Sequence, residues 1–148
     1  MPQVEFVIHG TPCGQPRVKA TTRGRHASVY TPTTVKDSSG QTKPHPAAVF
    51  KAGIKQAWGE LNLLPTDQPV TMLIEAVFPR PSAKRWKSRP MPSYEHCGKP
   101  DADNTAKAIM DALNGLAYFD DSQVWLLTVT KRVAAGDESP LTRVTISY

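Results

Sequence analysis

The stretch KPDADNTAKAIMDALNGLAYFDDSQ, residues 99–123, organises the rest of the chain. It holds five of the thirteen side-chain carboxylates, although the whole protein has a formal net charge of +5. Carboxylates that lie close together repel one another unless a cation lies between them. Mg²⁺ takes oxygen ligands of this kind, usually one or two carboxylates together with water and substrate phosphate. Metal-binding acids within a basic surface are what phosphodiester cleavage requires, so the stretch is a candidate metal site.

Two pairs of acids carry this hypothesis. Asp101 and Asp103 flank a single residue, so in an extended segment both side chains point the same way and can reach one cation. Asp120 and Asp121 form the second pair. Each pair alone fits a simpler role as a helix cap or a turn, and their combination with Lys107 favours a metal site. About twelve helical residues rise roughly 18 Å, and five extended residues span about 16 Å. The second pair therefore either just returns to the first or comes from another subunit, and the sequence leaves both open.

A helix is predicted between the two pairs, over about residues 103–114. Its apolar face consists of Ala106, Ile109, Met110 and Leu113. On the opposite side, Asp103, Lys107 and Asp111 recur at every fourth residue, and we expect Asp111 to hold Lys107 by an i, i+4 pair. Asp103 or Asn104 is expected to cap the first turn.

The remaining elements follow from periodicity. Alternating residues predict strands over residues 3–8, 70–78, 124–131 and 141–148, and a further helix over residues 46–59. The strand over residues 70–78 is apolar on both faces, so we expect it to be central and buried on both sides. The last two strands are expected to pair as an antiparallel hairpin. The predicted fold is α/β, of the α+β kind: a small single domain over residues 1–148, with a mixed four-stranded sheet packed against two helices.

Composition limits the classes of protein to which the chain can belong. No apolar run is long enough to span a bilayer, the N-terminus lacks the pattern of a signal peptide, and two cysteines make no disulfide framework. We therefore expect a soluble cytoplasmic protein that requires neither a membrane nor a small-molecule cofactor. The pI of about 9.4 favours a polyanionic partner, the simpler alternative being charge that serves solubility.

Two basic segments rich in proline and glycine, residues 10–46 and 79–100, interrupt the predicted elements. We expect the first to form a hairpin-like arm over residues 17–30. In the second, four cations and an exposed tryptophan lie within six residues, which suits a phosphate backbone and an unstacked base. The candidate DNA-binding residues are Arg17, Lys19, Arg23, Arg25, Lys84, Arg85, Trp86, Lys87, Arg89 and Lys99. The alternative for both segments is a solvated basic loop.

The acidic stretch resembles the RusA family of Holliday junction resolvases, small endonucleases of bacteria and their phages. The matching pieces, in the family's order and spacing, are Lys99-Pro100-Asp101-Ala102-Asp103-Asn104, Lys107, Asp111-Ala112-Leu113-Asn114-Gly115 and Asp120-Asp121-Ser122-Gln123-Val124. A looser match lies at Pro16-Arg17-Val18-Lys19 and Tyr30-Thr31-Pro32. The resemblance implies the same mixed sheet with two helices.

The resemblance also implies a function. It implies a metal-dependent endonuclease that resolves four-way or branched DNA by paired symmetric nicks, in recombination and repair. The implied catalytic residues are Asp101, Asp103, Lys107 and Asp121, of which the three acids bind the metal, with Asp120 as a further candidate ligand. Mg²⁺ is the implied cofactor, with Mn²⁺ as a substitute. The implied assembly is a homodimer. The apolar faces of the first strand and the first helix are candidate interfaces. The implied setting is bacterial or phage-encoded.

Other interpretations stay open at this point. Residues 101–105 also match the Asp-x-Asp-x-Thr motif of haloacid-dehalogenase-like phosphatases, although no buried strand precedes them. Four residues, His9, Cys13, His96 and Cys97, offer zinc ligands at poor spacing. The serious alternatives are a DNA-binding module whose acids no longer bind metal, and a nuclease that cuts branched DNA more broadly.

Overall fold

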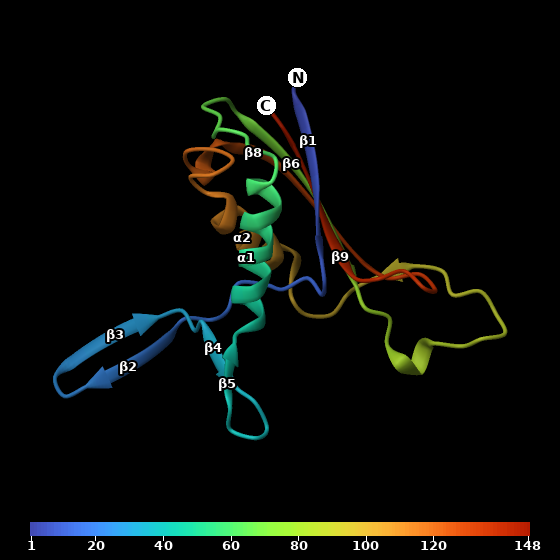
Figure 1. Cartoon of the computed structure of the whole chain (residues 1–148), viewed down its shortest axis with the longest axis horizontal. Helices are drawn as coiled ribbons and strands as arrows, with labels where there is room; N and C mark the ends of the chain where they lie inside the picture. The colour runs from blue at the N-terminus through green and yellow to red at the C-terminus, as the bar shows by residue number, and fades with distance from the viewer.

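A mixed five-stranded sheet with two helices on one face forms the body of the protein (Figure 1). The computed structural model describes all residues from Met1 to Tyr148. In chain order the elements are β1 (Gln3–His9), β2 (Lys19–Arg23), β3 (His26–Tyr30), β4 (Thr34–Lys36), β5 (Thr42–Pro44), α1 (Pro46–Gly59), β6 (Val70–Phe78), η1 (Ser82–Lys84), β7 (Tyr94–Glu95), α2 (Ala102–Leu113), η2 (Asp121–Gln123), β8 (Val124–Val133) and β9 (Leu141–Ser147). The strands of the main sheet lie in the order β1-β9-β6-β8-β7.

Both helices form where the sequence predicts them, and their apolar faces meet the inner faces of β1, β6 and β9 in one core. α1 has the predicted bounds, and α2 begins one residue earlier than predicted. The N-cap of α2 is Asp101 rather than Asp103 or Asn104. Its carbonyl accepts hydrogen bonds from Thr105 N and Thr105 Oγ1, both at 3.0 Å, while its side chain makes no capping bond. The Asp101 carboxylate is therefore not used by the helix.

The prediction that the last two strands form a hairpin is wrong. β8 runs parallel to β6, and β9 lies antiparallel between β1 and β6. α2 carries the chain from β6 to β8 as a crossover, which leaves the other edge of β6 free. β9 fills this position because it is buried along most of its length, with Thr142, Val144 and Ile146 inaccessible to solvent. A buried strand needs hydrogen-bond partners on both edges.

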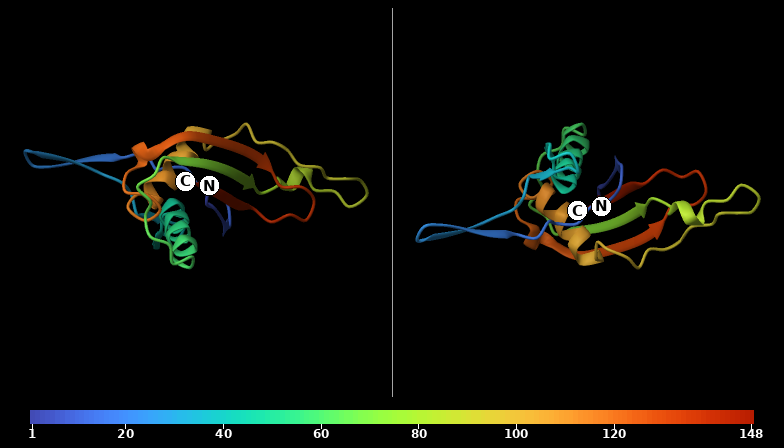
Figure 2. Two further views of the ribbon diagram at one scale, coloured as in Figure 1. Left: turned by 90° about the horizontal axis from the view of Figure 1, so that it is seen from above. Right: turned by 90° about the horizontal axis from the view of Figure 1, so that it is seen from below.

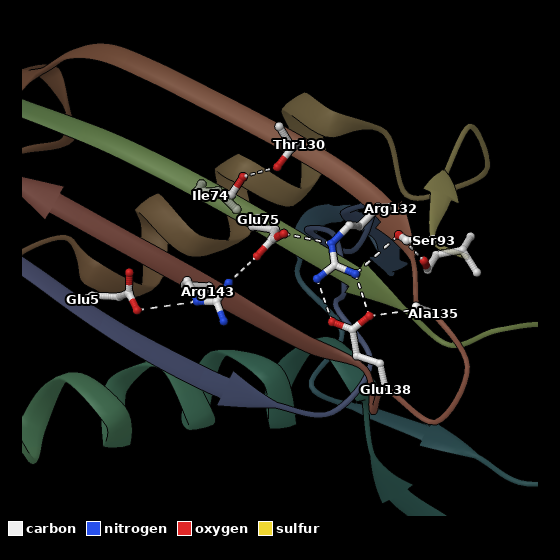
Figure 3. Close-up of polar contacts among 10 residues, drawn as sticks. Glu5, Ile74, Glu75, Ser93, Thr130, Arg132, Ala135, Glu138 and Arg143 are labelled. Atoms are coloured by element: carbon white, nitrogen blue, oxygen red, sulfur yellow. Dashed lines mark hydrogen bonds and ion pairs between the residues drawn. The ribbon is translucent and has the colours of Figure 1, made fainter. Parts of the chain in front are cut away.

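The sheet is also wider and more exposed than predicted. β7 adds a fifth strand inside a segment that was expected to be irregular. β6 is central, as expected, but Leu73 on the face away from the helices is 45% exposed. That face carries an ion network: Arg132 Nε lies 2.8 Å from Glu75 Oε1, Arg132 Nη1 lies 2.6 Å from Glu138 Oε2, and Arg143 Nη1 lies 2.5 Å from Glu75 Oε2 (Figure 3). No second layer covers this face, so charged side chains can remain near water.

The two basic segments lie at opposite ends of the molecule (Figure 2). The β2–β3 hairpin is exposed at every residue and extends from one end, as predicted for the arm. Gly24 turns this hairpin with a φ of +62°, a conformation that favours glycine. β4 and β5 form a second small hairpin, so the segment over residues 10–46 is more ordered than a loop. None of the helices is both long enough and apolar enough to cross a membrane.

Candidate active site

The first turns of α2 form one wall of a polar pocket of about 700 Å³. Asp101 precedes the helix, Asp103 lies in its first turn and Lys107 follows one turn later, and all three line the pocket. Arg17 and Lys99 line it as well. A carboxylate in the first turn of a helix is favoured by the helix dipole. The structure thus brings together two acids and three cations that the sequence analysis singled out.

Close packing of the N-terminal segment against α2 brings Arg17 into the pocket. Gln15 N donates to Asn104 O at 3.2 Å, and Asn104 Nδ2 donates to Gln15 O at 3.2 Å. Gly14 permits this approach because a Cβ there would overlap Asn104 Nδ2 and lie 2.9 Å from Pro100 Cβ. Gly14 and Gln15 could not be singled out from the sequence, since no local pattern connects residues that are 89 positions apart.

An exposed ion pair sets the electrostatics of the first acid. Lys99 Nζ lies 2.5 Å from Asp101 Oδ2, and this hydrogen bond holds the pKa of the Asp101 carboxyl below its ordinary value. Both side chains are more than half exposed, so water screens the pair and it contributes little to stability. Asp101 is therefore ionised at neutral pH and available to a second cation.

Lys131, on the neighbouring strand β8, holds the loop that carries this acid. Its Nζ donates to Gly98 O at 2.7 Å and to Pro100 O at 2.6 Å, directly before Asp101. His96, stacked on Phe78 at a centroid distance of 3.9 Å, lies 3.2 Å through its Nε2 from Lys99 O. Lys131 was not singled out from the sequence, because its place beside this loop depends on the pairing of β8 with β6 and β7, which only the structure shows.

The second pair of acids lies beyond the far end of α2. Asp120 caps η2, and hydrogen bonds from Ser122 lower the pKa of its carboxyl. Neither Asp120 nor Asp121 lines the pocket. No three Asp, Glu, His or Cys residues are grouped closely enough to hold a metal ion. A three-acid site is thus not assembled within one copy of the chain, and metal binding by Asp121 stays a prediction.

Two other expectations are not met in the structure. The four candidate zinc ligands form no cluster. Lys107 makes no ion pair with Asp111, because the Asp111 carboxylate turns toward α1, where its Oδ2 lies 4.0 Å from Lys51 Nζ. Lys107 therefore projects into the pocket without a carboxylate partner.

Residues 9–147 match the family described as Endodeoxyribonuclease RusA. The chain belongs to the RusA endodeoxyribonuclease family. This match confirms the resemblance and covers the pocket, both helices and both basic segments. The chain is also 40% identical over 68 residues to Uncharacterized protein YqaN of Bacillus subtilis (strain 168). That alignment covers 43% of this chain and 48% of the relative, so it spans about half of the relative's length.

In this RusA-family chain, the predicted DNA-binding residues fall into three places. Arg17 and Lys99 line the pocket. The helix α2, whose first turns form a wall of this pocket, lies between the two basic ends (Figure 1). The β2–β3 hairpin at one end carries Lys19, Arg23 and Arg25, and the segment at the other end carries Lys84, Arg85, Trp86, Lys87 and Arg89. A two-stranded ribbon is one of the elements that fit a DNA groove.

The basic segment at the second end is organised by a buried arginine. Arg80 is 5% exposed, and it donates from Nε to Lys84 O at 2.6 Å and from Nη1 to Pro92 O at 2.8 Å. Trp86, expected to be exposed, is partly buried, with the Arg80 and Arg89 guanidinium groups 5.2 Å and 4.0 Å from its ring centroid. These cation–π contacts give Trp86 a role within its own loop. Arg80 was not among the residues predicted from the sequence, and its hydrogen bonds hold the backbone of the basic segment.

Proposed function

We propose that the protein is a divalent-metal-dependent endodeoxyribonuclease that resolves Holliday junctions and related branched DNA by paired nicks. The observation that supports this most strongly is the pocket at the N-terminus of α2, where Asp101 and Asp103 lie among Lys107, Lys99 and Arg17. Carboxylates suit a metal ion, and the three cations suit a phosphodiester. Membership of the RusA family supports the same chemistry.

The donor set of the pocket fits Mg²⁺. Proteins hold Mg²⁺ through one or two carboxylates and leave other positions to water and substrate phosphate. Asp101 and Asp103 supply two carboxylates, and the pocket is lined by no sulfur or imidazole that would select a softer metal. These two residues would hold Mg²⁺, with Mn²⁺ as a substitute. The bound metal would activate water and stabilise charge on the scissile phosphate.

The cations of the pocket have distinct tasks. The planar Arg17 guanidinium matches two phosphate oxygens at once, whereas Lys107 acts as a point charge beside the acids. Lys99, on the exposed rim, exchanges its carboxylate partner for the DNA backbone. The two basic segments extend from opposite ends of the molecule with α2 between them (Figures 1 and 2), an arrangement that suits DNA arms meeting at the start of α2.

A four-way junction has two-fold symmetry, and a homodimer presents two sites to its opposing strands. We place this activity in recombination and repair, in the cytoplasm of a bacterium, with a chromosomal or phage gene. The similar Bacillus subtilis protein supports the bacterial setting.

The test is incubation of the pure protein with a labelled synthetic four-way junction, with Mg²⁺ or with EDTA, beside a linear duplex. We expect symmetric nicks in the junction alone, and only with metal. Asp103→Asn should abolish cleavage and leave junction binding intact, whereas the control Asp111→Asn, on the same helix but outside the pocket, should cut normally. Tight junction binding without cleavage under any divalent metal would indicate a DNA-binding module and not a nuclease. Normal cleavage by Asp103→Asn would overturn the site.

A further inference from the structure

A second pocket, of about 610 Å³, adjoins the candidate active site. Pro16 and Arg17 line both pockets, so the two share one wall. The rest of the lining comes from the β2–β3 hairpin, from the segment through β4 and from the residue before α1, and it includes Lys19, Tyr30, Pro32, Lys36 and His45. Pockets of roughly 300–1,000 Å³ hold small organic groups, so this one suits a single nucleotide and not a duplex arm.

The lining of the second pocket is basic. Arg17, Lys19 and Lys36 supply cations, no carboxylate lines the pocket, and none of the three cations forms an ion pair within the chain. Asp37 follows Lys36 but is used elsewhere, because its Oδ2 lies 2.8 Å from Lys43 Nζ and its Oδ1 accepts hydrogen bonds within its own turn. The pocket therefore has uncompensated positive charge for an anion such as a phosphodiester.

An aromatic ring lies beside these charges. Tyr30 is 49% exposed and lies opposite Lys19 in the β2–β3 ladder. Residues directly opposite each other in a ladder have Cβ atoms about 4.5–5.5 Å apart, so the ring and the ammonium group can act on one ligand. Pro32 adds an apolar ring to the lining. An aromatic face stacks on any nucleobase, while neighbouring cations hold the nucleic-acid backbone.

His45 adds a hydrogen-bond donor. As the N-cap of α1, it accepts a hydrogen bond from Ala47 N at its Nδ1, at 3.1 Å. A neutral imidazole that accepts at one ring nitrogen carries its proton on the other. The Nε2–H group of His45 therefore remains as a donor in the lining, suited to a phosphate oxygen or a base carbonyl.

We propose that the second pocket binds one unstacked nucleotide of the strand to be cut, directly next to the scissile phosphate, with its base on Tyr30 and its phosphate among the cations of the lining. This rests on the proposed nuclease function, because the scissile phosphate then lies in the first pocket. Arg17 lines both pockets, so neighbouring nucleotides of one strand can occupy the two.

The same pocket favours branched DNA over a linear duplex. The cost of taking a base out of the stack is smallest where pairing or stacking is already disturbed. Stacking is interrupted at the point where strands exchange, so a four-way junction supplies an unstacked nucleotide more readily than a linear duplex does. Tyr30 thereby selects the structure of the DNA, whereas the cations bind DNA of any structure.

Junction binding in EDTA tests the stacking contact without cleavage. Tyr30→Leu should weaken binding of a labelled four-way junction by roughly 5–100-fold, the size of a base–aromatic stack, and should leave binding of a linear duplex unchanged. Tyr30→Phe keeps the ring and should bind the junction as the wild type does. Val29→Ala is the matched control, because Val29 is 68% exposed and points to the opposite face of the same strand.

Circular dichroism checks that these variants are folded. Equal junction affinity for folded Tyr30→Leu and for the wild type would overturn the proposal. An equal loss of affinity for junction and linear duplex would overturn it as well, because the contact would then not depend on an unstacked base.

An abasic nucleotide in the DNA identifies the occupant of the pocket. Junctions are built with an abasic site at either of the two nucleotides that flank the nicked phosphate. At one of these positions Tyr30→Leu should cause no further loss of affinity, because the base that stacks on the ring is already absent. Additive losses at both positions would show that neither neighbouring base lies on Tyr30.

The dependence of binding on salt tests the phosphate contact. Each phosphate of a single strand that a cation neutralises adds about 0.7 to the slope of log affinity against log salt concentration, so Lys36→Met should lower the slope by about 0.7. Lys43→Met is the control, since Lys43 lies on the other strand of the β4–β5 hairpin, is paired with Asp37 and does not line the pocket. Equal slopes for Lys36→Met and the wild type would exclude a phosphate at Lys36.

Cleavage distinguishes failure of this proposal from failure of the proposed function. Wild-type protein that binds the junction through Tyr30 but cuts it under no divalent metal would refute the nuclease function, while the stacking contact would stand. Normal metal-dependent cleavage together with junction binding that does not depend on Tyr30 would refute the nucleotide pocket alone.

Discussion

Replacement of Gly14 by alanine should loosen the N-terminal segment from the active site. In the native packing, Gln15 and Asn104 exchange two hydrogen bonds, both at 3.2 Å, directly beside this glycine. An added methyl group would overlap Asn104 Nδ2 and would lie 2.9 Å from Pro100 Cβ. Arg17 follows three residues later and lines the pocket, so displacement of the segment also moves a phosphate ligand.

The loss of stability depends on which neighbouring residue can move away from the added methyl group. The Asn104 side chain can swing aside, at the loss of one hydrogen bond with a net contribution of about 0.5–1.5 kcal/mol. Pro100 is a rigid ring next to Asp101 and cannot do so, and overpacking of this kind costs roughly 1–3 kcal/mol. We therefore expect Gly14→Ala to destabilise the protein by roughly 1–3 kcal/mol. For a chain of this length, each kcal/mol lowers Tm by about 2–4 °C.

Thermal denaturation followed by circular dichroism measures this change, and Gly59→Ala is the control. A Cβ at Gly59 meets nothing within 4 Å, so that variant should be as stable as the wild type or slightly more stable. Asn104→Ala removes the nearest overlapping atom, and the Gly14→Ala penalty should be smaller in that background. Equal Tm values for Gly14→Ala and the wild type would refute the proposed close packing, as would strict additivity of the Gly14 and Asn104 substitutions.

Three further outcomes follow from single contacts. Lys131→Met should weaken Mn²⁺ binding by about 10–100-fold in calorimetry, because it releases the loop before Asp101; unchanged affinity would exclude a positioning role. Arg80→Met should destabilise the protein by roughly 1.5–3 kcal/mol in urea unfolding and should weaken junction binding, because it removes the hydrogen bonds that hold the basic segment. If stability and junction binding were both unchanged, the basic segment would be ordered without Arg80. Hydrogen bonds from Arg132 lower the pKa of Glu138 from 4.5 to about 2, so the associated stability is present above pH 4.5 and is lost as the pH falls toward 2. Glu138→Gln should flatten that part of the pH–stability profile. An unchanged profile would show that Glu138 does not contribute to the loss of stability at low pH.

Local sequence patterns were sufficient to predict most of the helices and strands. The bounds of α1 and β6 were predicted to the residue, because proline, glycine and the periodicity of apolar residues act over a few neighbouring positions. The hairpin of residues 17–30 was visible as basic residues around a glycine turn. The β8–β9 hairpin was predicted wrongly because strand pairing depends on which edge is vacant after α2 has crossed over, and no local pattern contains that information.

For the site, the sequence by itself determined the acid–lysine motif of α2 and its place in a basic chain, since both depend on residue type and on helical spacing. Only the tertiary structure decided which groups meet there. It brought Arg17 to Asp103 through the packing of Gly14, and it left Asp121 outside the pocket of its own chain. It also assigned Lys131 to the loop before Asp101. These contacts join residues dozens of positions apart, and they form only when packing of the core has fixed the layers that carry them.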